Sequence, residues 1–332
     1  MRAGPVAAIV GIAGTELLAE EASMLAAAPP VGVILFGRNV RDPEQVRTLT
    51  ASLRAVLPGA HIMIDQEGGR VARLRPPHWL AHPAAGVVGN GFSGDPGRSI
   101  RLAWLCGMLI GGECQALGVD VVAAPVLDLL VPGASTVVGD RSFGADPYTV
   151  GRLGRSFASG LMAAGVVPIG KHAPGHGRGR VDSHFALPEL DDVREDDLVP
   201  FVMNADLPWL MTAHIVYRVV DAGQPGTLSE SVIRDVIRGR IGFGGVLVSD
   251  DLSMKAVAGT PAELAVRAVG AGCDLALYGS GDFERTQALL GVCPTVSDVT
   301  ARRLTVGRAV AARRVRLDLA ALAAERDALL AG

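Results

Sequence analysis

Eight short apolar runs recur along the chain, each nearly continuous in Val, Ile and Leu and each separated from the next by a longer stretch. Strands that are buried on both faces of a parallel sheet have this composition, whereas strands of a half-exposed sheet alternate apolar and polar residues. The runs predict strands at 6–12, 31–36, 61–65, 119–125, 166–172, 208–214, 245–250 and 274–278. The pattern therefore predicts an α/β protein with a parallel sheet.

The stretches between the runs have helical character. Helices are predicted at 16–27, 43–57, 97–117, 147–164, 192–205, 229–241 and 261–271. Eight strands separated by helices fit a (β/α)8 TIM barrel, and a doubly wound open sheet is the alternative. The carboxyl ends of barrel strands converge on one mouth, which favours the barrel because four predicted strands end in a polar residue. These residues are Asp65, His172, His214 and Asp250.

We expect one catalytic domain over 1–332, with one or two C-terminal helices at about 295–331 packing on the barrel. The net charge of −3, from 31 basic and 34 acidic side chains, argues against a nucleic acid or an anionic membrane as partner. The apolar segment 4–13 is short and interrupted by glycine, which favours a first core strand over a signal peptide. We therefore expect a soluble, cytoplasmic monomer.

No cofactor is expected. The four cysteines show no zinc-ligand spacing and are expected to be reduced and buried. The sequence GNGFSG at 89–94 formally matches a dinucleotide-binding fingerprint. No convincing strand precedes it and no acidic residue follows at the required distance, so a nucleotide site is not predicted there.

The segment KHAPGHGRGRVDSH at 171–184 concentrates three of the seven histidines, and its glycines predict a pliable loop at the barrel mouth. Three interpretations remain open. His172, His176 and His184 could bind a metal, although adjacent basic residues would repel a dication. The histidines could instead only satisfy loop backbone groups. The favoured interpretation is acid/base chemistry, with the Asp182 carboxylate accepting from one nitrogen of the His184 imidazole.

A second cluster, VLVSDDLSM at 246–254, places Asp250 at the inner end of a strand. A carboxylate there is costly unless it is used or paired, which favours Asp250 as a nucleophile or anionic stabiliser. Asp251 is expected to point the other way and to cap the following turn.

Two arginine-containing clusters complete the predicted mouth. In IDQEGGRVARL at 64–74, Asp65 and Arg73 could hold a polyhydroxylated ligand, or could belong to an internal ion-pair network with Glu67. In GDRSFGADP at 139–147, Arg141 is a candidate ligand contact or a surface arginine. With Lys171, these residues suggest a hydrolase for a sugar-like substrate.

The four motifs IDQEGGRV, DRSFG, KHxPGHG with a following DSH, and SDDLSM occur in series between about 31 and 254. Together they resemble glycoside hydrolase family 3, and within it the single-domain bacterial β-N-acetylglucosaminidases of cell-wall recycling. The resemblance implies Asp250 as nucleophile and His184, assisted by Asp182, as acid/base. It implies substrate binding by a further set of residues, namely Asp65, Arg73, Arg141, Lys171 and His172.

The implied reaction is the removal of a terminal, non-reducing β-linked N-acetylglucosamine with retention of configuration, from muropeptides or chitooligosaccharides. The sequence departs from the family pattern at Ala173, where an aromatic residue is usual, and at the cationic pair Arg178 and Arg180. The cationic pair would suit an anionic acceptor. A phosphorylase that uses phosphate in place of water, a metal-dependent hydrolase and a non-catalytic sugar-binding barrel remain the alternatives.

Overall fold

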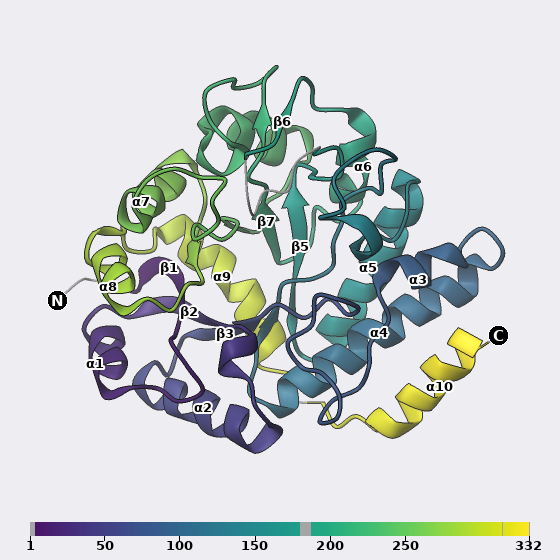
Figure 1. Cartoon of the computed structure of the whole chain (residues 1–332), viewed down its shortest axis with the longest axis horizontal. Helices are drawn as coiled ribbons and strands as arrows, with labels where there is room; N and C mark the ends of the chain where they lie inside the picture. Colours follow the sequence, from purple (N-terminus) through teal and green to yellow (C-terminus); the bar gives the residue numbers. More distant parts are fainter. Residues whose placement is uncertain (1–3, 180–186, 314, 332) are drawn as a thin grey trace.

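The computed structural model describes residues 4–179, 187–313 and 315–331. At its centre lie eight parallel strands (Figure 1), in the order β10-β1-β2-β3-β4-β5-β7-β9. They are β1 (Val6–Gly11), β2 (Pro30–Leu35), β3 (His61–Ile64), β4 (Val121–Val122), β5 (Val167–Ala173), β7 (Trp209–Thr212), β9 (Val246–Val248) and β10 (Ala276–Tyr278). Each overlaps one of the eight predicted strands, and their residues are buried, as the unbroken apolar runs indicated.

Backbone hydrogen bonds between β9 and β10 close the sheet into a barrel. The amide of Asp274 donates to the carbonyl of Leu247 at 2.8 Å, and the amide of Ser249 donates to the carbonyl of Leu275 at 2.9 Å. An open doubly wound sheet would keep its two edge strands apart. The barrel prediction is therefore confirmed.

Helices surround the strands (Figure 1). Three of them begin in the same way, with an aspartate that caps the helix and a proline in its first turn, because the proline lacks an N–H that would be unpaired there. The helices up to 271 are α1 (Ala19–Ala27), α2 (Pro43–Val56), α3 (Ala85–Asn90), α4 (Pro96–Ala116), α5 (Pro147–Ala163), α6 (Glu195–Val202), the π-helix Val232–Arg240 and α7 (Pro261–Ala271). A short parallel pair, β6 (Glu189–Leu190) and β8 (Val216–Tyr217), lies outside the barrel sheet.

Two helices were not predicted, the short α3 and the longer α8 (Phe283–Val292), which follows β10. The Asp282 carboxylate caps α8 by accepting from the amide of Arg285 at 2.9 Å. Few side chains of α8 are buried, among them Leu289 and Leu290. The apolar stripe is therefore narrow, which explains why periodicity alone did not mark this helix.

Two C-terminal helices follow, and they cover different parts of the barrel. Helix α9 (Asp298–Ala311) crosses Trp209, the first residue of β7, with Gly307 at the crossing. A Cβ atom on Gly307 would lie 2.8 Å from the indole nitrogen, so glycine permits this close approach. Helix α10 (Leu319–Ala331) packs on α4, where Arg101 pairs with Glu325 at 2.7 Å.

The two ends of the barrel carry different kinds of charged residue. At the amino-terminal ends of the strands, Asp120 pairs with Arg54 at 2.5 Å and Asp274 pairs with Arg303 at 2.9 Å. These pairs tie the strands to the surrounding helices, a stabilising role typical of this end of a TIM barrel. The carboxyl ends, where active sites of such barrels lie, carry those predicted site residues that belong to the described ranges.

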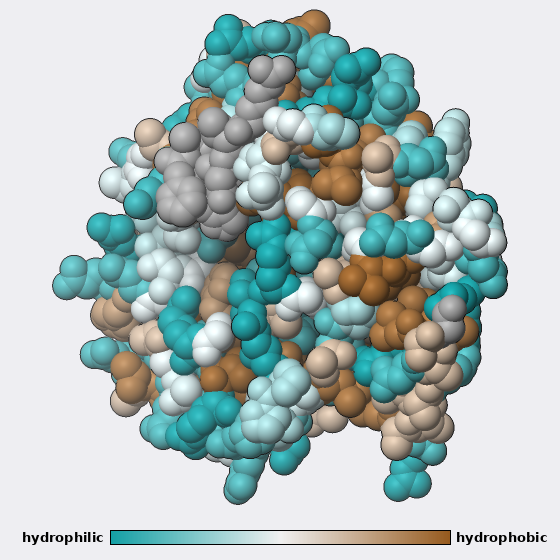
Figure 2. Space-filling view, turned by 45° about the vertical axis from the view of Figure 1, so that its right-hand side comes forward, coloured by the Kyte–Doolittle hydropathy of each residue, from teal (hydrophilic) through white to brown (hydrophobic). Residues whose placement is uncertain are grey.

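Hydrophilic and hydrophobic residues are interspersed over the face seen in Figure 2. Across the ranges that the structure describes, every helix is too short or too polar to cross a bilayer.

Candidate active site

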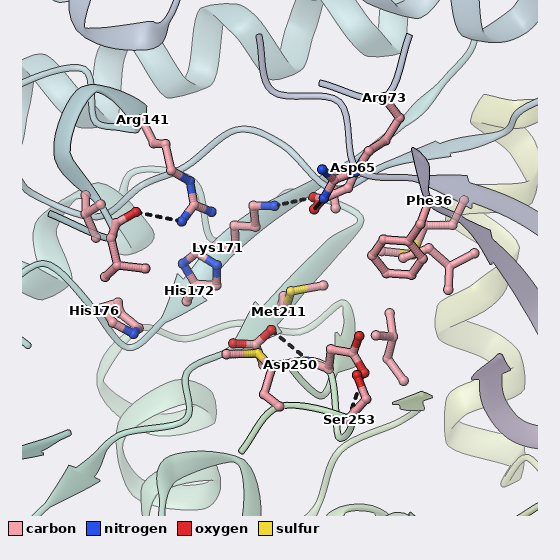
Figure 3. A pocket seen from close by; sticks show the side chains of 18 of the residues that line it. Phe36, Asp65, Arg73, Arg141, Lys171, His172, His176, Met211, Asp250 and Ser253 are labelled. Carbon is pink, nitrogen blue, oxygen red and sulfur yellow. Dashed lines mark hydrogen bonds and ion pairs between the residues drawn. The ribbon is translucent and has the colours of Figure 1, made fainter. Parts of the chain in front are cut away.

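A cavity of about 330 Å³ opens at the carboxyl ends of the strands (Figure 3). Its volume is at the small end of the range for ligand sites, which suits a ligand of the size of one sugar residue. Charged and ionisable side chains from several strand ends converge on it: Asp65, Arg73, Arg141, Lys171, His172, His176, Asp250, Asp251 and Lys255. The cavity thus brings together all the predicted site residues that the structure describes.

An ion-pair network forms one wall of this cavity. Lys171 Nζ lies 2.7 Å from Asp65 Oδ1 and 2.6 Å from Glu67 Oε1. Arg73 donates to the second oxygen of Asp65 at 2.7 Å, and Arg141 donates two hydrogen bonds of 2.8 Å to Glu67. The internal ion-pair network is therefore present, and four of its five members also line the cavity, so ligand binding by these residues stays a prediction.

The network keeps its members charged. Burial alone would raise the pKa of the Asp65 carboxyl, but the neighbouring Lys171 and Arg73 cations outweigh burial and hold this pKa well below its usual range. Glu67 behaves in the same way beside Lys171 and Arg141, so its pKa is also lowered. Burial would lower the pKa of Lys171, yet the two carboxylates raise it. The wall therefore presents charged donors and acceptors to the cavity.

Arg141 is not a surface arginine. Its side chain is 10% exposed, and a third hydrogen bond, of 3.0 Å, joins it to the carbonyl of Val137. The short helical turn at Gly139–Arg141 brings the guanidinium to the cavity, where it lies near Lys171 and His172 (Figure 3).

Asp250 faces this wall from β9 (Figure 3). Its amide donates to Thr212 Oγ1 at 3.1 Å, and its Oδ1 accepts from the amide of Asp251 at 2.8 Å. Burial raises the pKa of the Asp250 carboxyl, but the imidazoles of His214 and His172 and the Asp251 amide outweigh burial and lower it. A buried, ionised carboxylate at the end of a barrel strand has the chemistry of a nucleophile or of a stabiliser of positive charge.

Asp251 caps the following turn, as expected, but its side chain also lines the cavity and does not point away from it. Its Oδ1 accepts from the amide of Ser253 at 2.9 Å and from the amide of Gly279 at 3.0 Å. Burial raises its pKa above the usual value. Asp251 therefore ties the loop after β9 to the end of β10.

His214 lies at the end of β7 and holds the same loop. Its Nε2 donates to the carbonyl of Asp251 at 3.1 Å, and its Nδ1 is hydrogen-bonded to the hydroxyl oxygen of Thr227 at 2.8 Å. Because a carbonyl can only accept, this bond assigns the proton to Nε2. His214 is thus a scaffold for the segment that carries Asp250.

The sequence analysis missed Asp128. This residue follows β4 in the apolar run VLDLL, and its side chain is fully buried. Its Oδ2 accepts from His172 Nδ1 at 2.7 Å, and its Oδ1 accepts from the amide of His176 at 2.7 Å. A single carboxylate inside an apolar run was the signal that could have found it.

The loop after β5 is described in part. Asp182 and His184, the predicted acid/base pair, lie outside the described residues, as does Arg180. Arg178 pairs with Asp197 at 2.7 Å, so its positive charge is balanced within the protein. Ala173 is buried in β5, and its carbonyl accepts from the amide of Ala213 at 2.8 Å. In the described ranges, no three His, Cys, Asp or Glu side chains gather as metal ligands.

The fold and the site together define a TIM-barrel glycoside hydrolase. A family model described as the glycosyl hydrolase family 3 N terminal domain matches residues 8–309. The chain belongs to this family, which confirms the resemblance drawn from the four motifs.

Relatives and solved structures agree with this assignment. A protein of Pseudomonas aeruginosa named beta-hexosaminidase is 42% identical over 276 residues, which are 81% of each chain. Another beta-hexosaminidase, from Alkalilimnicola ehrlichii, is 41% identical over 313 residues, covering 92% of this chain and 88% of the relative. The structure of NagZ from Neisseria gonorrhoeae in complex with N-trifluoroacetyl-D-glucosamine superimposes with a TM-score of 0.87 at 33% identity, over 98% of both chains.

Proposed function

We propose that the protein is a retaining exo-β-N-acetylglucosaminidase with Asp250 as its nucleophile. One observation carries the proposal: Asp250 is a buried, ionised carboxylate that faces a wall of ion-paired side chains across a cavity of about 330 Å³. The names of the relatives and the N-acylated glucosamine held by the gonococcal structure support N-acetylglucosamine as the sugar. The small cavity supports removal of one terminal residue at a time.

The reaction proceeds in two displacements. Asp250 attacks the anomeric carbon, the glycosidic bond breaks, and the leaving oxygen takes a proton from His184. Water then attacks the glycosyl-enzyme, gives its proton to His184 and releases Asp250. Asp182 orients the His184 imidazole and balances its charge, as a carboxylate does for the histidine of a catalytic triad.

A panel of 4-nitrophenyl β-glycosides, assayed with and without phosphate, tests this function. We expect turnover of the N-acetylglucosaminide, little turnover of the glucoside and xyloside, and β-N-acetylglucosamine as the first anomer seen by NMR. Sugar-1-phosphate as the main product would make the protein a phosphorylase. Binding of N-acetylglucosamine without turnover of any substrate would show that the protein is a non-catalytic sugar-binding barrel.

The acid/base assignment predicts an effect that depends on the leaving group. His184→Ala should reduce kcat/KM strongly for a disaccharide, whose alkoxide leaving group must be protonated, and far less for a dinitrophenyl glycoside, whose leaving group needs little protonation. Asp182→Asn should follow the same trend more weakly. Equal losses on both substrates would exclude His184 as the acid.

From Lys255 we predict a preference for substrates whose leaving group carries a carboxylate, as in muropeptides. The chain has two lysines and both line this cavity, but Lys171 is paired with carboxylates. Lys255 is exposed at the rim and has no ion pair or hydrogen bond with any residue of the described ranges. Lys255→Ala should lower kcat/KM about threefold for an aryl glycoside that bears a carboxylate, because an exposed ion pair contributes roughly 0.2–1 kcal/mol.

The matched carboxamide substrate is the control for this prediction, and its turnover should not change in Lys255→Ala. High salt should reduce the difference between the two substrates in the wild type. Equal kinetics of wild type and variant on the carboxylate substrate at low salt would refute a role for Lys255.

A further inference from the structure

Asp128 joins two parts of the site that are far apart in sequence. It follows β4 and its side chain is fully buried, whereas both of its histidine partners belong to the segment that ends β5 and begins the next loop. The carboxylate receives three N–H groups: the amide of His176 at 2.7 Å, the ring Nδ1 of His172 at 2.7 Å, and the amide of His172 at 3.2 Å from each oxygen.

These contacts determine which ring nitrogen of His172 is available to form a hydrogen bond with a ligand. An ionised carboxylate only accepts hydrogen bonds, so the proton of this contact is on Nδ1. The pKa of Asp128 would be raised by burial, but the adjacent His172 outweighs this effect and keeps the carboxyl ionised. His172 also lines the cavity, close to Arg141 and Lys171 (Figure 3), so Nε2 is the nitrogen left for the substrate.

We propose that Asp128 is a positioning residue that holds His172 with its proton on Nδ1 and so presents Nε2 to a hydroxyl group of the bound sugar. The sugar is that of the proposed function, on which this inference rests. Asp128 touches no substrate itself. It acts through the imidazole, as the carboxylate partners of metal-bound histidines do when they fix the tautomer and the orientation of the ring.

Replacement of Asp128 by asparagine separates this role from simple packing, because the shape is kept and one acceptor is lost. Asparagine has one accepting oxygen and one donating NH2 group. The amide of His176 cannot change from donor to acceptor, so the oxygen must stay with it. The NH2 group then faces His172 Nδ1, and the ring can accept from it only by moving its proton to Nε2. In the variant, His172 Nε2 would therefore donate a hydrogen bond to the sugar, whereas in the wild type it accepts one.

The experiment combines NMR with kinetics. Nitrogen-15 spectra of histidine-labelled protein distinguish the two tautomers, and the signal of His172 is assigned by its loss in His172→Gln. We expect a proton on Nδ1 in the wild type and on Nε2 in Asp128→Asn. We also expect kcat/KM on the N-acetylglucosaminide to fall on the order of 10–100-fold, the usual effect of losing such a partner.

Asp120→Asn is the matched control. Asp120 is also a buried aspartate that accepts from a backbone amide, that of Ile62 at 3.0 Å, but it lies at the other end of the barrel. The Asp120→Asn variant should have a lower Tm than the wild type, with an unchanged His172 tautomer and unchanged kinetics. The inference is overturned if wild-type His172 carries its proton on Nε2, if Asp128→Asn leaves the tautomer unchanged, or if it keeps kcat/KM within threefold. The wild-type spectrum tests the inference even if a variant fails to fold. A wild type without glycosidase activity would refute the proposed function, which is a separate outcome.

Discussion

Replacing Asp250 by alanine is expected to lower kcat on 4-nitrophenyl N-acetyl-β-glucosaminide by about 10⁴-fold or more, which corresponds to about 5 kcal/mol of transition-state stabilisation. No other carboxylate among the described lining residues can replace it. The Asp65 carboxylate is paired with Lys171 and Arg73, and the Asp251 carboxylate is bonded to the amides of Ser253 and Gly279. The loss should appear in kcat, because the ion-paired wall proposed to bind the sugar remains in place.

Asp251→Asn is the control for this prediction, since it changes the adjacent carboxylate. The Oδ1 atom that accepts both amides survives in asparagine, so kcat should stay within about threefold of the wild type. Azide added to Asp250→Ala should restore turnover and give the α-glycosyl azide, because the small anion enters the space left by the carboxylate. Wild-type turnover by a pure Asp250→Ala preparation would show that Asp250 is not the nucleophile.

The barrel could be predicted because each buried parallel strand is recognisable from its own short segment of sequence, as an unbroken apolar run. The run at 246–248 is apolar throughout, and Asp250 follows it after a single residue, Ser249. Strand ends of a barrel converge, so a polar residue at the end of a strand is placed by topology alone. The same reasoning placed Asp65 and His172, although their roles are predictions that activity measurements must test.

Contacts between distant loops could not be predicted in the same way. Asp128 stands beyond its predicted strand, and its partner His172 is 44 residues away. Glu67 was noticed beside Asp65, but its partners Lys171 and Arg141 come from two other segments. Such pairs depend on three-dimensional packing, which a single sequence does not encode in any local pattern.

Replacing Lys171 by methionine should impair both activity and folding. The ammonium group bridges Asp65 and Glu67 in a site where its own side chain is 3% exposed. Removing one partner of a buried ion pair leaves uncompensated charge and costs on the order of 3–5 kcal/mol. For a chain of this length we expect Tm to fall by roughly 5 °C or more. Activity should fall on the order of 100-fold or more, because Asp65 and Glu67 lose the cation that bridges them and fixes their geometry.

The dependence of this loss on pH distinguishes the ion pairs from lost packing. In the wild type the pKa values of Asp65 and Glu67 lie below their unfolded values, so their contribution to stability is present above the unfolded pKa and is lost as the pH falls. The difference in Tm between wild type and Lys171→Met should therefore shrink as the pH falls below about 5.

Arg303→Met is the matched control for Lys171→Met, since it breaks a partly buried ion pair with Asp274 at the opposite end of the barrel. It should lower Tm without changing kcat/KM, because active sites of such barrels lie at the carboxyl ends of the strands. A Tm difference for Lys171→Met that stays constant from pH 8 to about pH 3, below the unfolded pKa values of both carboxyls, would mean that packing of the lysine stem, rather than its charge, stabilises the site. Equal kinetic losses in both variants would mean that activity simply follows stability, and the separation of a binding end from a stabilising end would then be wrong.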